Sequence, residues 1–156
     1  MSPLIGRTLL SGTIASLAMA AALGAMARRE GKSAIRSINA TSHWYHGAKA
    51  GRARRADLPH TAVGFATHYG ASLFWAALFE ALRRRIPGRA PFRAAAVSAL
   101  AAVVDYGLVP KRLTPGWERV LPPEAIALAY FAMALALGAT RVEPENKRRA
   151  GSEGAP

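Results

Sequence analysis

The sequence predicts an all-α, polytopic membrane protein in which four transmembrane helices form a small up-down bundle with a basic, interfacial first loop. Half of the 156 residues are hydrophobic (51%), and they gather in four long stretches that are almost free of charge. The basic residues, which give a formal net charge of +12, gather between these stretches. A spanning helix needs about 20 mostly apolar residues, and cationic loops at its ends are typical of membrane proteins.

The position of the charges also indicates the partners. In a soluble protein, a net charge of +12 would suggest nucleic acid binding. Here the basic residues flank apolar stretches, so we expect membrane lipids with anionic headgroups as partners, and no nucleic acid. The two sides carry nearly equal numbers of basic residues, and the positive-inside rule therefore predicts no orientation. A soluble helical bundle is the alternative, but its helices would show a polar face that these stretches lack.

The first span is expected over residues 8–27, which contain no charged residue. Small residues recur there at four-residue spacing, which lets helix backbones approach closely. This packing is expected inside the bundle, and it would also suit a homo- or hetero-oligomer. Because Ala25-Met26-Ala27 has the form of a signal-peptidase site, cleavage is an alternative, although the length of the apolar region and the arginines that follow favour a retained span.

The second span is expected over residues 58–82 and contains two histidines. At 100° per residue, one slowly drifting stripe of this helix collects His60, Gly64, His68, Ser72 and Trp75. An unpaired polar group in hydrocarbon costs several kcal/mol, so the stripe is predicted to face the bundle. His68 lies deep and is expected to pack and hydrogen-bond between helices, while Gly64 lets a neighbouring helix come close.

The third and fourth spans are expected over residues 94–109 and 122–140. Pro110 ends the third span, because the residue before a proline avoids helical geometry. Asp105 lies about one turn below the membrane surface and needs a polar partner. The candidates are His60, Thr61, Lys111 and Arg112. Residues 1–140 form the transmembrane domain, and the basic segment 141–156 is predicted to be a disordered tail.

A shared site is predicted where the first loop meets the second and third spans. In the stretch NATSHWYHG, two histidines lie three residues apart on one face of a short helix, a spacing that suits two ligands of one metal ion. The residues predicted to bind a divalent metal such as zinc, or to handle protons, are His43, His46, His60 and Asp105. The alternative is that each of them satisfies a helix end or a loop and anchors the first loop onto the bundle. No other cofactor is expected.

Seven other side chains are expected to have structural polar roles: His68, Asn39, Trp44, Trp75, Lys111, Arg112 and Trp117. Trp44 and Trp117 suit the headgroup layer, where amphipathic rings collect. Lys111 and Arg112 are placed to meet lipid phosphates or Asp105.

The stretches NATSHW, HTAVGFATH, FWA and DYGLVPKRLTPGWE occur in this order. In these stretches the chain resembles a family of small four-helix inner-membrane proteins of bacteria whose function is unknown, and the resemblance covers most of the chain from Asn39 to Trp117. The resemblance implies a multi-pass location in the bacterial inner (plasma) membrane and a four-helix fold. It implies no activity.

The sequence contains no cysteine, no H-E-x-x-H or G-x-S-x-G motif, no P-loop and no dinucleotide-binding fingerprint. It therefore favours a small membrane protein without evident catalytic function, with a structural or accessory role in a membrane assembly. The first alternative is a metal-binding or proton-linked protein that uses the histidine–aspartate cluster. A small transporter is the weaker alternative, because the small multidrug resistance transporters carry a glutamate in their first helix, and the first span here has no acidic residue.

Overall fold

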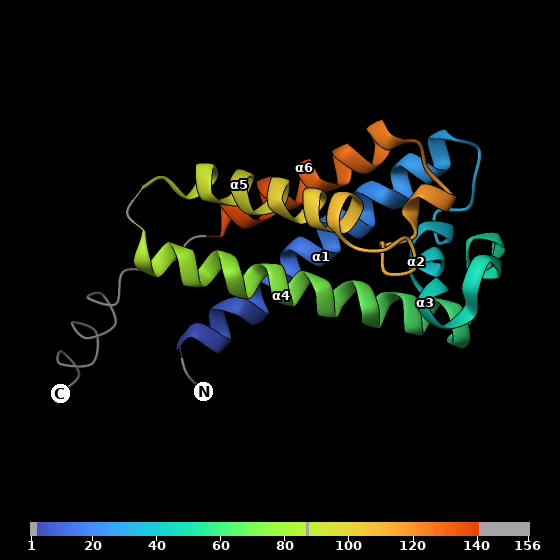
Figure 1. Ribbon diagram of the computed structural model, residues 1–156, viewed down its shortest axis with the longest axis horizontal. Helices are drawn as coiled ribbons and strands as arrows, with labels where there is room; N and C mark the ends of the chain where they lie inside the picture. Colours follow the sequence, from blue (N-terminus) through green and yellow to red (C-terminus); the bar gives the residue numbers. More distant parts are fainter. Residues whose placement is uncertain (1–2, 87, 141–156) are drawn as a thin grey trace, which may run out of the picture.

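The computed structural model describes residues 3–86 and 88–140, and every regular element in these ranges is helical. Four long helices run in alternating directions along one bundle: α1 (Pro3–Arg29), α4 (Val63–Arg85), α5 (Ala90–Val103) and α6 (Pro123–Ala139) (Figure 1). Six short elements connect them: α2 (Arg36–Thr41), α3 (His43–His46), η1 (Gly47–Arg52), η2 (Leu58–Ala62), η3 (Val104–Leu108) and η4 (Trp117–Arg119). The predicted all-α class is confirmed. The predicted tail, 141–156, lies outside the described residues.

The four predicted helices are all present, with different ends. α1 is longer than predicted, and η2 with α4 forms one continuous helical segment, as α5 does with η3. Within residues 3–86 and 88–140, two helices are long and apolar enough to cross a membrane: Pro3–Arg29 and Ala90–Leu108. α6 is apolar but has only 17 residues. The segment that begins at Leu58 is less apolar because its inward stripe is polar and because it ends in Glu80 and three arginines. Four spans are therefore not confirmed.

α1 lies at the centre of the packing, against both α4 and α6, while α5 packs against α6. Of the small residues that recur at four-residue spacing in α1, Ser11, Gly12, Ala15 and Ser16 are buried, and Ala20 is partly buried. A Cβ atom at Gly12 would lie 2.7 Å from the Cδ2 atom of Leu73 on α4. This face of α1 is thus occupied by α4 within the chain.

The first and third loops meet at one end of the bundle, on the right of Figure 1, where α2 and α3 lie. The Lys32 ammonium donates a hydrogen bond to the carbonyl of Val120 (2.5 Å) across these loops. α4 packs on α2 at Gly64, where a Cβ atom would collide with the carbonyl oxygen of Ile38. The close approach expected at Gly64 is therefore present, and it seats the first loop on the bundle.

Candidate functional site

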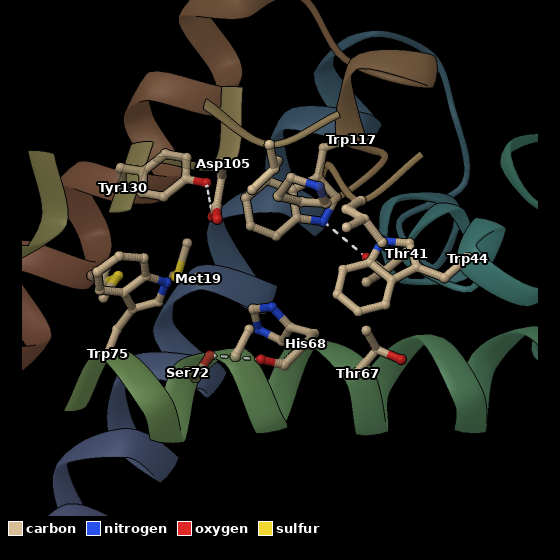
Figure 2. A pocket seen from close by; sticks show the side chains of 15 residues that line it. Met19, Thr41, Trp44, Thr67, His68, Ser72, Trp75, Asp105, Trp117 and Tyr130 are labelled. Atoms are coloured by element: carbon tan, nitrogen blue, oxygen red, sulfur yellow. Dashed lines mark hydrogen bonds between the residues drawn. The ribbon is translucent and has the colours of Figure 1, made fainter. Parts of the chain in front are cut away.

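A chamber of about 200 Å³ lies inside the bundle, between its middle and the end that carries the first and third loops (Figure 2). α4 contributes one wall through Thr67, His68, Ala71, Ser72 and Trp75, and α1, η3 and α6 contribute the others. The third loop, with Trp44 of α3, forms its outer boundary. All three tryptophans of the chain line this one chamber: Trp44, Trp75 and Trp117.

His68 is buried in the chamber wall, with 3% of its surface exposed. Its Nε2 atom lies 3.0 Å from the carbonyl oxygen of Ser16 on α1. A carbonyl only accepts, so Nε2 carries the proton and Nδ1 keeps a free lone pair. The ring of Trp117 meets that of His68 edge-on at 5.8 Å. His68 therefore holds α4 to α1 across a small residue, as its depth predicted.

Asp105 lies on the opposite side of the chamber, in the π-helical turn η3. This rare form of helix is frequent at functional sites. The hydroxyl of Tyr130 on α6 donates a hydrogen bond of 2.6 Å to one carboxylate oxygen. Within the described ranges, the other oxygen has no hydrogen-bond partner, and the carboxylate forms no ion pair. The partner is thus Tyr130, and the prediction of His60, Thr61, Lys111 or Arg112 was wrong.

The two tryptophans expected in the headgroup layer direct their indole N–H groups into the protein. Trp117 is buried, with 3% exposed, and its Nε1 donates to the hydroxyl of Thr41 (3.1 Å). Trp44 is partly buried, and its Nε1 donates to the carbonyl of Thr114 (2.9 Å). A headgroup anchor keeps its N–H toward water or lipid, so the role expected for Trp117 was wrong: both indoles fasten the first loop to the third.

A second polar group lies at the surface, where η2 begins. The Asp57 carboxylate accepts a hydrogen bond from the backbone N–H of His60 (2.6 Å) and also lies 3.0 Å from its Nδ1 atom. The rings of His60 and His46 are 4.8 Å apart, and the Nε2 atom of His46 donates to the carbonyl of Pro59 (2.9 Å). Because Asp57 caps the helical segment that begins at Leu58, its pKa is lowered, first by the backbone N–H of His60.

His43 is separate from both groups. It is buried in α3, with 4% exposed, and its Nδ1 atom donates to the carbonyl of Ala40 (3.0 Å). Its Nε2 atom has no partner among the described residues. Gly116 packs directly on this ring, since a Cβ atom there would lie 2.6 Å from Nδ1.

The four residues predicted to share a site therefore fall into three places. His46 and His60 are in contact at the surface, His43 is buried beneath the third loop, and Asp105 lines the chamber. In residues 3–86 and 88–140, no three histidine, aspartate or glutamate side chains are grouped so that they could hold a metal ion. Lys111 and Arg112 are exposed, and no described contact joins either side chain to Asp105.

Asn39, which was expected to have a structural polar role, holds the first loop in place through three hydrogen bonds. It is fully buried, and its amide donates to the carbonyls of Ala53 (3.1 Å) and Arg55 (2.9 Å). Its side-chain oxygen accepts from the hydroxyl of Thr61 (2.7 Å). One side chain thus joins α2, the strand-like segment after η1 and the start of the second long helix.

Three polar residues with partners in the structure were not predicted as site residues from the sequence. Asp57 could have been found, because an aspartate followed two residues later by proline is a signal for a helix start. Tyr130 gave no signal, since a tyrosine in an apolar helix does not reveal its partner. Glu80 is buried at the far end of α4, with 2% exposed, and accepts from Arg83 at 3.5 Å; its helical spacing to Arg83 was a usable signal.

The chamber is arranged for binding more than for acyl transfer. A hydrolytic triad needs serine, histidine and carboxylate linked in series. Here the hydroxyl of Ser72 donates to the backbone carbonyl of His68 (2.9 Å), and the ring of His68 is bonded to α1. Asp105 is bonded to Tyr130, so the three side chains form no such relay. What remains is an aromatic chamber with one carboxylate.

Comparison of the chain with models of protein families, with curated proteins and with solved structures found no match.

Proposed function

We propose that this chain is a multi-pass inner-membrane protein with four spans, and that it binds a small molecule in its internal chamber without transforming it. Such binding would serve an accessory role in the membrane. The observation that carries the proposal is the chamber itself, into which the chain gathers all three of its tryptophans together with His68 and Asp105.

The outer surface supports the four-span arrangement. Large apolar side chains are exposed on every long helix, among them Leu10 (57%) and Leu17 (55%) on α1, Phe74 (64%) on α4, Phe92 (72%) on α5 and Phe131 (60%) on α6. A protein in water exposes such residues singly, whereas contiguous apolar surface marks contact with lipid or with another protein. Lipid contact explains all four faces at once.

The charges of α4 are compatible with a span because they are satisfied within the protein or lie at its end. Glu80 is paired with Arg83, which also donates to the carbonyl of Thr140 (3.1 Å) at the end of α6. The next two arginines are exposed beyond it. Buried charges in a bilayer need such partners, and exposed arginines at a span end suit anionic headgroups.

Binding fits the chamber better than transport does. The lining residues belong to the half of the bundle near the first and third loops. The other half is filled by buried side chains of the core, including Ala76, Phe79 and Leu137. A transporter needs alternating access to its site from both sides, whereas the described residues that line the chamber belong to one half of the bundle.

Reporter fusions after Arg36, Gly88, Arg119 and Thr140 test the four spans. If all four long helices cross the bilayer, successive fusions report opposite compartments. If only the two most apolar helices crossed, the fusions after Arg36 and Gly88 would report the same compartment, as would those after Arg119 and Thr140. That pattern would overturn the topology.

Tryptophan fluorescence tests the chamber, because every tryptophan lines it. Benzene and the neutral alcohol 3,3-dimethylbutan-1-ol would be added to protein purified in a nonionic detergent. We expect a saturable change in emission that Ala71→Leu abolishes, because this exposed residue lines the chamber and a larger side chain would fill its edge. Ala66→Leu, equally exposed on the same helix but not part of the lining, should leave the change in emission as it is. A response that persists in Ala71→Leu, or that neither probe produces, would contradict a binding chamber.

A further inference from the structure

We propose that the chamber selects a small organic cation bearing a methylated ammonium group, with Asp105 as the counter-charge and the tryptophan rings as the surfaces that receive it. This rests on the proposed function, because it names the class of molecule that the chamber takes. The structure supports it through charge, lining chemistry and size.

The first argument is charge. Among the described residues that line the chamber, Asp105 is the only acidic one, and none is a lysine or an arginine. The Tyr130 hydroxyl gives the carboxylate one hydrogen bond but no positive charge. The ring of His68 is bonded through Nε2 to the carbonyl of Ser16 on α1, and no described hydrogen bond or ion pair joins it to the carboxylate. A carboxylate within a spanning bundle is costly without a partner, and a bound cation would provide it.

The second argument is the aromatic lining. Indole is the best aromatic receptor for a cation, which is attracted over the ring face within about 6 Å of its centroid. Three indoles reach the chamber from three different elements, α3, α4 and η4, so they surround the space instead of stacking on one side. In Figure 2, Trp75 and Trp44 lie on opposite sides of the view, with Asp105 and His68 between them.

The third argument distinguishes a methylated ammonium from a metal ion. A hard metal cation such as Ca²⁺ is bound by six or more oxygen ligands, and zinc by a set of histidine, cysteine or carboxylate ligands. The chamber offers one carboxylate in a largely apolar wall that includes Met19, Met133 and Leu113. A methylated ammonium spreads its charge over apolar methyl groups and needs few hydrogen-bond acceptors, which is the chemistry that this lining supplies.

Size is consistent with such a ligand. An apolar cavity of about 150 Å³ accommodates benzene, so a chamber of about 200 Å³ has room for a trimethylammonium group with a short tail. The same group occurs in free solutes and on lipid headgroups. We assign the chamber to the free solute, because about 200 Å³ holds the trimethylammonium group with a short tail, while the glycerophosphate of a lipid would have to remain outside the chamber.

Choline and 3,3-dimethylbutan-1-ol test the inference, because the two molecules have the same shape and differ in the charge of one atom. Tryptophan emission of the protein in a nonionic detergent would be titrated with each. We expect choline to bind about tenfold more tightly or better, the ratio expected from cation–π contacts and one carboxylate. Equal affinities would overturn the cation assignment while leaving the binding chamber intact, and a response to neither would overturn the chamber.

Asp105→Asn separates charge from shape. It should remove the preference for choline and leave the binding of the neutral alcohol unchanged, whereas Asp105→Glu should retain the preference. Glu124→Gln, an exposed carboxylate in the first turn of α6, controls for the overall charge of the protein. A preference for choline that survives in Asp105→Asn would overturn the role of the carboxylate. If Asp105→Asn fails to fold, Trp75→Phe takes its place and should weaken the binding of choline but not that of the neutral alcohol.

A lipid arm distinguishes the two sources of the group. Protein in nanodiscs of phosphatidylglycerol should bind free choline, and replacing half of the lipid with phosphatidylcholine should not compete. Competition by phosphatidylcholine would overturn the assignment to the free solute in favour of a headgroup site.

Discussion

The chamber and the surface group at the start of η2 contain the same residue types, yet they are built in opposite ways. The surface group joins Asp57 to His60 within four residues of one helix start, and its side chains are 39% and 25% exposed. The chamber joins Asp105 to Tyr130 and places His68 across from them, using elements that are far apart in the sequence. A local group follows from the rules of helix capping, whereas the chamber exists only when the bundle has formed.

The difference also separates two kinds of aspartate. Asp57 has water, a backbone N–H and a histidine to stabilise its charge. Asp105 has one tyrosine hydroxyl and no described ion pair. Asp57 has the partners of a helix cap, so its role is structural. Asp105 lies in a chamber without a described cationic partner, and an acidic residue within a spanning bundle is a candidate for function.

The largest effect is expected from Gly64→Ala, because Gly64 lies where the two regions join. A Cβ atom there would collide with the carbonyl of Ile38, so α2 would have to move away from α4. We expect a loss of about 3 kcal/mol in the free energy of unfolding, typical of severe overpacking. Thermal unfolding in detergent measures it. Gly70→Ala, where nothing lies within 4 Å, is the matched control and should stabilise the same helix slightly.

Asn39→Ala should damage the surface region and leave the chamber intact. It removes three hydrogen bonds that join the first loop to the start of the second long helix. We expect a loss of about 2 kcal/mol in the free energy of unfolding, since two of the three partner residues are partly buried and the third is exposed. Ser37→Ala is the control, because the hydroxyl of Ser37 is buried on the same short helix without a partner. If the two variants unfold at the same temperature, the Asn39 bonds contribute no net stability.

Tyr130→Phe should affect the chamber and leave the surface region intact. It removes the hydrogen bond to Asp105 and retains the ring that packs at 5.8 Å from Trp117. We expect a loss of about 1 kcal/mol in stability with no change in the surface group. Tyr45→Phe, at a side chain that is 72% exposed, should have no measurable effect. A Tyr130→Phe protein as stable as the parent would show that the carboxylate is satisfied in another way.

The sequence predicted the features that depend on neighbouring residues. The helical class, the four long helices, the inward stripe of α4 from Gly64 to Trp75 and the close approach at Gly64 follow from residue types and their spacing, and the structure contains them. His60 was predicted in the same inward stripe, but it lies at the surface beside Asp57. The depth of His68 also predicted its role between helices. These properties belong to one helix at a time.

The grouping of site residues failed because it used depth along the membrane and ignored the rotation of each helix. His60 and Asp105 were both expected where the first loop meets the second and third spans, but η3 directs Asp105 toward α6, where Tyr130 lies. Trp117 was assigned to the headgroups because it is amphipathic, yet the first loop folds over it and supplies Thr41 as its acceptor. Contacts of this kind depend on how helices and loops face one another, which periodicity within one segment does not contain.

The smallest effect is expected at the surface group, and it concerns pH. The pKa of Asp57 is lowered below its ordinary value of 3.8, first by the backbone N–H of His60. A lowered pKa in the folded state means that the ionised carboxylate stabilises the fold. This contribution is fully present above pH 3.8 and is lost as the pH falls through the lower pKa of the folded protein.

Asp57→Asn should keep the helix cap, because asparagine caps as well as aspartate, and should remove this part of the acid sensitivity. The measurement is the thermal midpoint of parent and variant at pH 6 and below pH 3.8. The parent should lose more than the variant, by a small margin because the group is exposed and screened. Equal losses would show that the acid sensitivity of the protein arises elsewhere, and a difference confined to neutral pH would show that Asp57 acts through its charge on another partner.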